Sequence, residues 1–335
     1  MSEIPLKQLP YFSSSRGSFQ RRTILALLAA NGFLSACAPP KPAMRVGTIV
    51  FPGYELLFLA RELGKLNPGL VRLVELQNSS DSVRALAAGE IEAALLTLDE
   101  MMSACAGGVE LCAVAVLDTS FGADQVLAKP GITMENLAKA RVAAEDNSVG
   151  ALMMASLLEA AKLSINQVVK VPITQSRATE FYQKGLTDVV ITAEPWASQI
   201  KALGGHTIFD STSVPDRIVD VIAVRAELLE TYAPAIQHLV DAQFIGLDFF
   251  HTNTAQATPL LAPRLQLQPS EVVSSYDGLK LPDRKENQTM LKPQGTLAKN
   301  LPGLQSILLT AKLLPKVIDT KALLDDRFVK KGSAE

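Results

Sequence analysis

Residues that build metal centres are scarce in this sequence. Only three of its 335 residues are cysteine and only three are histidine. The histidines, His206, His238 and His251, lack the spacing of a metal-binding pair, and neither H-E-x-x-H nor C-x-x-C occurs. We therefore expect no metal site.

The sequence motifs of common enzymes are missing as well. There is no G-x-S-x-G nucleophile elbow and no Gly-rich phosphate-binding loop. We therefore expect a protein that is not an enzyme and that has no catalytic residues and no cofactor.

Excess positive charge and long apolar runs are also absent from the sequence. The formal net charge is -2, so we expect no binding to nucleic acid. No apolar run approaches the roughly 20 residues that a membrane-spanning helix needs. Aromatic residues make up only 5% of the chain, whereas alanine and leucine are abundant, which favours helices packed on sheets.

The N-terminal part has the layout of an export signal. Residues 1–22 are polar and contain three arginines and one lysine against one glutamate, and residues 23–34 are apolar. Small residues follow, which is typical of a secretory signal peptide. A buried helix would explain neither the basic leader nor the "APPKP" that comes next. We predict a signal peptide in residues 1–36 and a tether in residues 37–43.

The motif "LSAC", which ends at Cys37, resembles the lipobox of bacterial lipoproteins. This resemblance implies cleavage before Cys37 and its acylation. Several acyl chains would hold the protein on the periplasmic side of a bacterial membrane. The segment "RRTIL" also resembles a twin-arginine export signal. The export route, and the choice between inner and outer membrane, stay open.

Two further cysteines, Cys105 and Cys112, lie between a predicted helix and a predicted strand. Outside the reducing cytosol they could form a disulfide if their Cα atoms came within about 7 Å. Two unpaired buried thiols are the alternative that we slightly prefer.

Strand and helix patterns alternate from residue 44 onward. Residues 44–51, 70–77 and 91–98 have the pattern of buried strands, with helices predicted between them. The same rhythm recurs up to residue 210. It predicts an α/β fold in which each of two lobes is a mostly parallel sheet flanked by helices.

Two short polar segments indicate how the lobes are joined. "DTSFGAD" (118–124) and "STSVPD" (211–216) are rich in small and acidic residues and stand next to apolar strands. We predict that both are crossover segments beside a cleft. The chain would then divide into lobe I, residues 44–118 plus 211–335, and lobe II, residues 119–210.

Several segments together resemble a known family. "GYELLFLARELG", "AGEIEAALLTLDE", "ARVAAEDNSVGALMMASLLEAAKLS" and "AEPWASQI", in this order and spacing, are similar to solute-binding proteins of bacterial ABC importers. The resemblance is to the aliphatic-sulfonate, taurine and nitrate type, and it is weakest after Thr252. It implies the two-lobed periplasmic-binding-protein fold of type II, with two crossover segments.

The resemblance also implies a function. A lipid-anchored, exported monomer would capture a small polar organic solute by closing its cleft, and would deliver the solute to an ABC permease and its ATPase subunit. Two alternatives stay open. One is an extracytoplasmic enzyme of related fold, of the pyrimidine-forming type, and the other is a ligand sensor.

Ligands of open parallel sheets bind beyond the carboxyl ends of the strands, where helices begin. Polar, acidic and aromatic residues are frequent at these positions. We predict that the solute is bound by Phe51, Tyr54, Ser79, Ser80, Asp81, Thr97, Asp99, Asp118, Ser120, Gly122, Asp124, Ser148, Glu194, Trp196 and Asp220.

The charge of these strand ends conflicts with an anionic ligand. Acidic residues far outnumber basic ones there, and only Arg217 lies in the same segments, with Arg84 and Lys129 nearby. Unpaired carboxylates beside an anion in a small desolvated cleft would be strongly unfavourable. We therefore expect a ligand with an amine or several N–H or O–H donors, in preference to nitrate or a simple alkanesulfonate.

Overall fold

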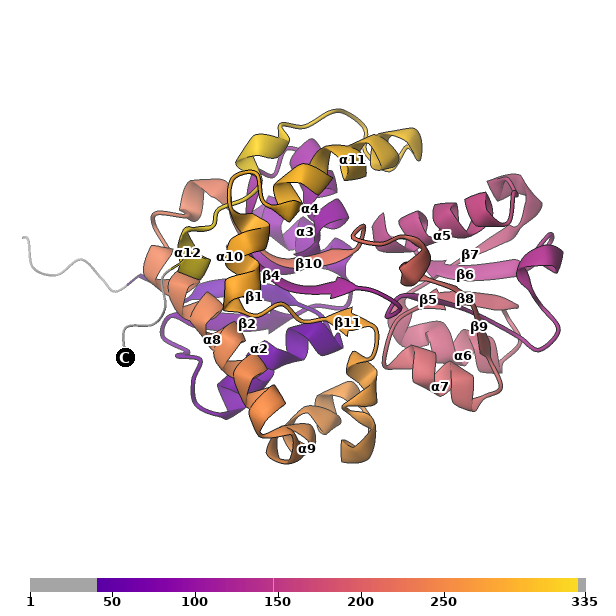
Figure 1. The fold of residues 1–335 in the computed structure, drawn as a ribbon, viewed down its shortest axis with the longest axis horizontal. Coiled ribbons are helices and arrows are strands. Elements are labelled where there is room, and N and C mark those ends of the chain that lie inside the picture. The colour runs from indigo at the N-terminus through magenta and orange to yellow at the C-terminus, as the bar shows by residue number, and fades with distance from the viewer. Residues whose placement is uncertain (1–40, 147, 331–335) are drawn as a thin grey trace, which may run out of the picture. The chain divides into compact units, whose positions relative to one another are not determined.

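Alternating strands and helices build two sheets in the computed structural model, which describes residues 41–146 and 148–330 (Figure 1). In the first sheet the order is β11-β4-β10-β3-β1-β2. Every residue of the central strands β3 and β4 is buried, because helices cover both faces. The strands are β1 (Met44–Thr48), β2 (Val71–Glu75), β3 (Ala93–Thr97), β4 (Leu111–Ser120), β10 (Val219–Arg225) and β11 (Leu279–Lys280).

The helices that pack on the first sheet begin at prolines and capping residues that are visible in the sequence. Pro52 opens α2, where its missing N–H costs no hydrogen bond, and the Asn78 side chain caps α3. In Figure 1, α3 and α4 lie on one side of the strands and α2, α8 and α9 on the other. The helices are α2 (Pro52–Glu62), α3 (Ser79–Ala88), α4 (Leu98–Ala106), α8 (Ala233–Thr252), α9 (Thr254–Leu265), α10 (Arg284–Leu291), α11 (Thr296–Thr310) and α12 (Arg327–Lys330).

The second sheet has the order β7-β6-β8-β5-β9 and a separate core. Helix α5 covers one face, and α6 and α7 cover the other (Figure 1). Its strands are β5 (Gln125–Ala128), β6 (Arg141–Glu145), β7 (Val169–Ile173), β8 (Val189–Thr192) and β9 (His206–Asp210), and its helices are α5 (Ser148–Ala160), α6 (Ala178–Gln183) and α7 (Trp196–Ala202).

Two segments cross between the sheets and are bonded to each other. Residues 121–124 lead from β4 into β5, and residues 211–218 lead from β9 back into β10. The hydroxyl oxygens of Ser120 and Ser211 lie 2.7 Å apart, and the Gly122 N–H donates to the Ser211 hydroxyl at 2.6 Å. The φ of Gly122 is 108°, a backbone conformation that favours glycine. The predicted two-sheet α/β architecture with two crossings is thus confirmed.

The prediction that each sheet is mostly parallel is wrong in one respect, because both sheets are mixed. Strands β2, β1 and β3 pair in parallel, as do β7, β6 and β8, but β10 is antiparallel to β3 and β4, and β5 to β8 and β9. The reason is the route of the chain. A strand that enters from the other sheet starts at the edge where the parallel strands end, so it must run the opposite way.

The remaining cysteines are unpaired in the described part of the chain. Both Cys105 and Cys112 are free thiols, as expected, but only Cys112 is buried, whereas Cys105 is half-buried. Within the same residues, no helix is both long and apolar enough to cross a membrane. Cys37 and the predicted signal peptide lie outside the described residues.

Candidate functional site

The carboxyl ends of strands from both sheets meet around a small space, which we call the inner chamber. Its volume is ≈ 40 Å³. It is lined by Ile49, Phe51, Tyr54, Ser79, Thr97, Glu100, Asp124, Glu145, Val149, Gln175, Ala193, Ile218 and Asp220.

A larger space, the outer pocket, adjoins the inner chamber. It has a volume of ≈ 260 Å³ and shares Ile49, Phe51, Glu145 and Gln175 with the chamber. Its other lining residues are Val50, Glu75, Leu76, Gln77, Asn78, Ser176, Pro195, Trp196, Gln199, Arg264, Leu265 and Gln266. A ligand could therefore place one end in the chamber and its body in the pocket.

Helix starts position the polar groups of the chamber. Thr97 precedes α4, and its backbone N–H donates to Glu100 Oε2 at 3.2 Å, as in a capping box. The Ser79 hydroxyl, in the first turn of α3, donates to the other oxygen of Glu100 at 2.5 Å. Glu100 is thereby fixed at the chamber wall.

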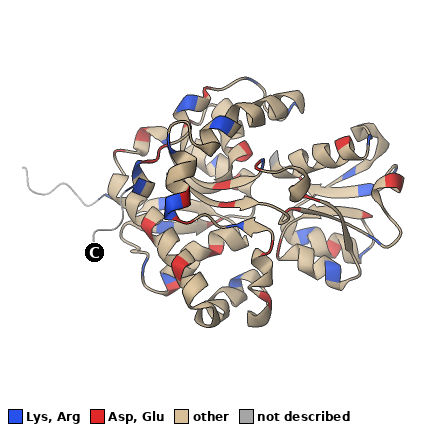
Figure 2. Cartoon of the chain, viewed as in Figure 1, with Lys and Arg blue, Asp and Glu red and all other residues tan. Residues whose placement is uncertain are grey.

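Two facing aspartates stand at the end of the first sheet. Asp118 of β4 and Asp220 of β10 are directly opposite in the strand register. The Tyr54 hydroxyl donates to Asp220 Oδ1, whereas no N–H or hydroxyl group of the described residues reaches either oxygen of Asp118. Asp118 therefore faces only the Asp220 carboxyl group, with which it can share a proton. Figure 2 shows acidic positions along the strands of this sheet.

Burial raises the pKa values of these carboxyl groups, because removal from water disfavours their charged form. It raises the pKa of Asp118 to about 7, against the effect of a hydrogen bond with Asp220, and the pKa of Asp124 to about 6. Burial and the charge of Asp118 raise the pKa of Asp220 well above its ordinary value. Burial followed by the charge of Glu100 raises the pKa of Glu145 to about 7. The chamber thus holds acids that titrate near neutrality.

We expect the ligand-free protein to lose stability as the pH rises from 5 to 8. In the unfolded chain these acids titrate near pH 4. Their raised folded-state pKa values mean that the stability is fully present below about pH 4 and is lost as the pH rises through 6 to 8. The melting temperature measured across this range should fall, and Asp118→Asn should flatten the slope. A melting temperature that rises from pH 5 to pH 8 would contradict the assignment.

Seven of the residues predicted from the sequence lie at these two spaces. Trp196, at the start of α7, lines the outer pocket, and Phe51 lines both. The predicted residues at the inner chamber are Phe51, Tyr54, Ser79, Thr97, Asp124 and Asp220.

The other predicted residues lie elsewhere. Asp99 and Asp118 are fully buried but are not among the lining residues, and burial followed by the charge of Glu100 raises the pKa of Asp99 to about 8. The Ser120 hydroxyl forms a hydrogen bond with the Ser211 hydroxyl and so links the two crossings. Half-buried Ser80 and Asp81 occupy the first turn of α3.

Gly122 and Glu194 line a third cavity, of ≈ 450 Å³. Glu194 Oε2 accepts the Ser198 N–H of α7 at 3.1 Å, so it satisfies a helix-start donor. The side chain of Ser148 lies outside the described part of the structure.

The sequence reasoning missed several polar residues of these spaces, among them Glu100, Glu145, Gln175 and Arg264. "TLDE", which ends at Glu100, is a capping-box sequence and could have identified that residue. Glu145 is the last residue of β6, so its position at a strand end could also have identified it. No sequence signal indicates Gln175 or Arg264, because their positions depend on long-range packing.

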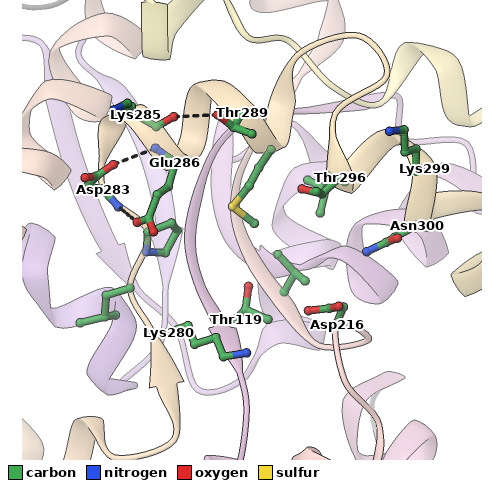
Figure 3. Close-up of a pocket in the computed structure, with 15 residues that line it drawn as sticks. Thr119, Asp216, Lys280, Asp283, Lys285, Glu286, Thr289, Thr296, Lys299 and Asn300 are labelled. Carbon is green, nitrogen blue, oxygen red and sulfur yellow. Dashed lines mark hydrogen bonds between the residues drawn. The ribbon is translucent and has the colours of Figure 1, made fainter.

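A cavity of ≈ 880 Å³, larger than the two spaces above, is formed by β11, α10, α11, the end of β4 and the crossing 211–218. Figure 3 shows Thr119 of β4 and Asp216 of the crossing 211–218 on one side of it, and Thr296, Lys299 and Asn300 of α11 on another. None of the residues predicted from the sequence lines it, so we do not assign the solute to it. In the described residues, no group of three or more Asp, Glu, His or Cys side chains could hold a metal ion.

Comparison with known proteins supports the sequence resemblance. Residues 37–258 match the NMT1-like family, and no curated protein matches the chain. The fold is similar to the ligand-binding component of an ABC-type import system from Staphylococcus aureus, solved with zinc bound. The identity is 15%, the TM-score is 0.72, and the match covers 88% of this chain and 99% of that one.

Two other solved structures share the fold. The periplasmic aliphatic sulphonate-binding protein SsuA from Escherichia coli is 18% identical, with a TM-score of 0.70 over 86% of this chain and 93% of that one. The desulfurization enzyme DSZB is 16% identical, with a TM-score of 0.60 over 86% and 98%. At these identities the likeness shows the fold alone. It confirms the predicted two-lobed type II periplasmic-binding-protein fold.

Proposed function

Because the chain belongs to the NMT1-like family, we propose that it is an extracytoplasmic solute-binding protein of an ABC importer. It captures a small polar organic solute between its two lobes and delivers the solute to a permease and its ATPase subunit. The lobes are residues 44–118 with 211–335, and residues 119–210. The observation that supports this proposal best is the inner chamber, whose walls come from both sheets.

The mechanism follows from that geometry. Tyr54 and Asp220 belong to the first sheet and its helices, whereas Glu145 ends a strand of the second sheet. A solute that touches both groups gains contacts only in the closed form, so it shifts the population toward closure. The two crossings provide the hinge, and the permease recognises the closed lobes.

Small-angle X-ray scattering tests this function. We expect the radius of gyration of the purified protein to change when a mixture of small amines, amino acids, sulfonates and nitrate is added, because the bound solute stabilises one arrangement of the lobes. An unchanged scattering curve with every component of the mixture would contradict the function.

An enzyme is the second candidate, because DSZB has the same fold. In the described residues, no cysteine, histidine or lysine lines the inner chamber or the outer pocket, which favours binding over covalent chemistry. Mass spectrometry of the same mixture after incubation separates the two functions. A binding protein returns every compound unchanged, and an enzyme converts one of them.

We expect Cys37→Ser to release the protein from the membrane without changing its melting temperature. We propose that Cys37 is acylated and follows a cleaved signal peptide, as the "LSAC" sequence implies. Acyl chains would provide the anchor, because no helix of the described residues is long and apolar enough to cross a membrane. Fractionation of bacterial cells that express wild type or variant measures this. Equal amounts of both proteins in the detergent-extracted membrane fraction would exclude the lipid anchor.

A further inference from the structure

Carboxyl groups dominate the polar wall of the inner chamber. Glu100, Asp124, Glu145 and Asp220 reach it from four different elements, and all are at most 9% exposed. The other polar side chains there are neutral hydroxyl or amide groups. No lysine, arginine or histidine lines the chamber in the described residues.

The facing pair Asp118 and Asp220 concentrates this acidity at one point. Residues opposite each other in an antiparallel pair have side chains on the same face of the sheet. Asp118 is 0% exposed and meets no N–H or hydroxyl donor of the described residues. It packs against Gly53, where any Cβ would overlap its carboxyl oxygen. Two such carboxyl groups cannot both be charged unless a cation lies close to them, and without one the pair holds a proton.

The size of the chamber limits what can bind in it. Its volume of ≈ 40 Å³ is far below the ≈ 260 Å³ of the outer pocket, so it fits a small head group and not the body of a ligand. The rings of Phe51 and Tyr54 border it, with centroids 5.2 Å apart. Aromatic rings attract cations through their faces. The body of the ligand would extend into the outer pocket, which adjoins the chamber.

The outer pocket contains one cationic side chain, and it already has partners. Arg264 pairs with Glu55 at 2.5 Å and with Glu75 at 2.7 Å. An anion in the chamber would therefore lie beside several carboxyl groups without a free positive charge to balance it. Like charges at this separation in a buried site repel each other strongly.

We propose that the inner chamber binds the ammonium head group of a small organic amine, whose positive charge balances the carboxylates of Asp124 and Asp220 that line the chamber. This inference rests on the solute-binding function proposed above and names the chemical class of the solute. The ammonium group donates hydrogen bonds to Asp220 and Asp124. The rings of Phe51 and Tyr54 border the same space and attract its positive charge. Binding of the amine releases the proton that the aspartate pair held.

Isothermal titration calorimetry at pH 8 with five probes tests the inference. The probes are butylamine, ethanolamine, taurine, nitrate and ethanesulfonate. We expect saturable binding of at least one of the two amines and none of nitrate or ethanesulfonate. The amine should bind more weakly at pH 5, where Asp118, Asp124, Glu145 and Asp220 hold their protons. Its heat should depend on the ionisation enthalpy of the buffer, because a proton is released.

Two variants separate recognition from folding. Asp220→Asn and Asp124→Asn should weaken amine binding by about 10- to 100-fold, since each removes a charged acceptor. The same variants should raise the melting temperature of the ligand-free protein at pH 8, an increase that a merely structural role would not give. Glu159→Gln, on an exposed position of α5, makes the same charge change away from the chamber and should bind as wild type does.

The outcomes are distinct for the two proposals. Binding of nitrate or ethanesulfonate, without detectable binding of butylamine or ethanolamine up to about 10 mM, would overturn the amine inference and leave the solute-binding function intact. Amine binding that Asp220→Asn and Asp124→Asn leave unchanged would place the amine elsewhere and also overturn it. The solute-binding function itself fails only if the scattering curve stays unchanged with the whole mixture.

Discussion

Replacement of Arg264 by alanine is expected to lower the free energy of unfolding by about 3–5 kcal/mol at pH 8. Arg264 of α9 is the ion-pair partner of Glu55, which is 0% exposed, and its guanidinium group stacks 3.5 Å from the centroid of the Phe58 ring. Removal of one partner leaves a buried charge without compensation. Urea denaturation of the wild type and the variant measures the difference.

The decrease in the free energy of unfolding caused by Arg264→Ala should be smaller at lower pH. Burial already raises the pKa of Glu55, and Arg264 opposes that rise. Without Arg264 the pKa of Glu55 rises further, so the carboxyl group takes up a proton at pH 5 and the penalty of its charge disappears. A loss that is equally large at pH 5 and pH 8 would contradict a charge effect.

A nearby arginine provides the matched control. Arg61 lies over the same Phe58 ring, at 4.7 Å, but its partner Glu62 is exposed. Exposed pairs contribute little, so Arg61→Ala should change the free energy of unfolding by less than about 1 kcal/mol. The contrast between the two variants isolates the buried carboxylate.

Gly246→Ala is expected to destabilise the protein by at least about 2–3 kcal/mol. Gly246 is buried in α8, where that helix packs on α2. A Cβ at this position would overlap the carbonyl oxygen of Leu56 and lie 3.0 Å from its carbonyl carbon. Backbone atoms of a packed helix cannot move aside as a flexible side chain can, so the helices must separate. Thermal and urea denaturation measure the effect.

Gly303→Ala provides the control for the general effect of alanine in a helix. Gly303 is exposed in α11, and a Cβ there meets nothing within 4 Å. Because alanine favours helix, this change should be neutral or stabilise by about 1 kcal/mol. Equal destabilisation by both substitutions would show that close packing of α2 and α8 is not the cause.

The sequence predicted the two sheets well, because their signals are local. Apolar runs, N-capping residues and Pro52 are visible within a few residues of each element. The polar crossings were also recognisable, since "DTSFGAD" interrupts two buried strands. The mixed strand directions were missed, because the direction of β10 depends on where the chain re-enters the first sheet.

The site was only partly predictable. Its acidic character could be predicted from the composition of the strand ends. Which of the acidic residues line the chamber, and which are buried beside it, could not be predicted. Asp118 stands opposite Asp220 because β10 pairs with β4, a contact between residues far apart in sequence. The position of Arg264 beside Glu55 depends in the same way on the packing of α9 against α2.

Equilibrium dialysis tests the central claim most directly. The purified protein is dialysed at pH 8 against an equimolar mixture of butylamine, ethanolamine, taurine, nitrate and ethanesulfonate, and both compartments are quantified by mass spectrometry and ion chromatography. Trp196 fluorescence gives an independent signal, because that residue lines the outer pocket. We expect an amine to accumulate with the protein at close to one molecule per chain. Equal concentrations of all five compounds on both sides, or accumulation of an anion alone, would contradict the account.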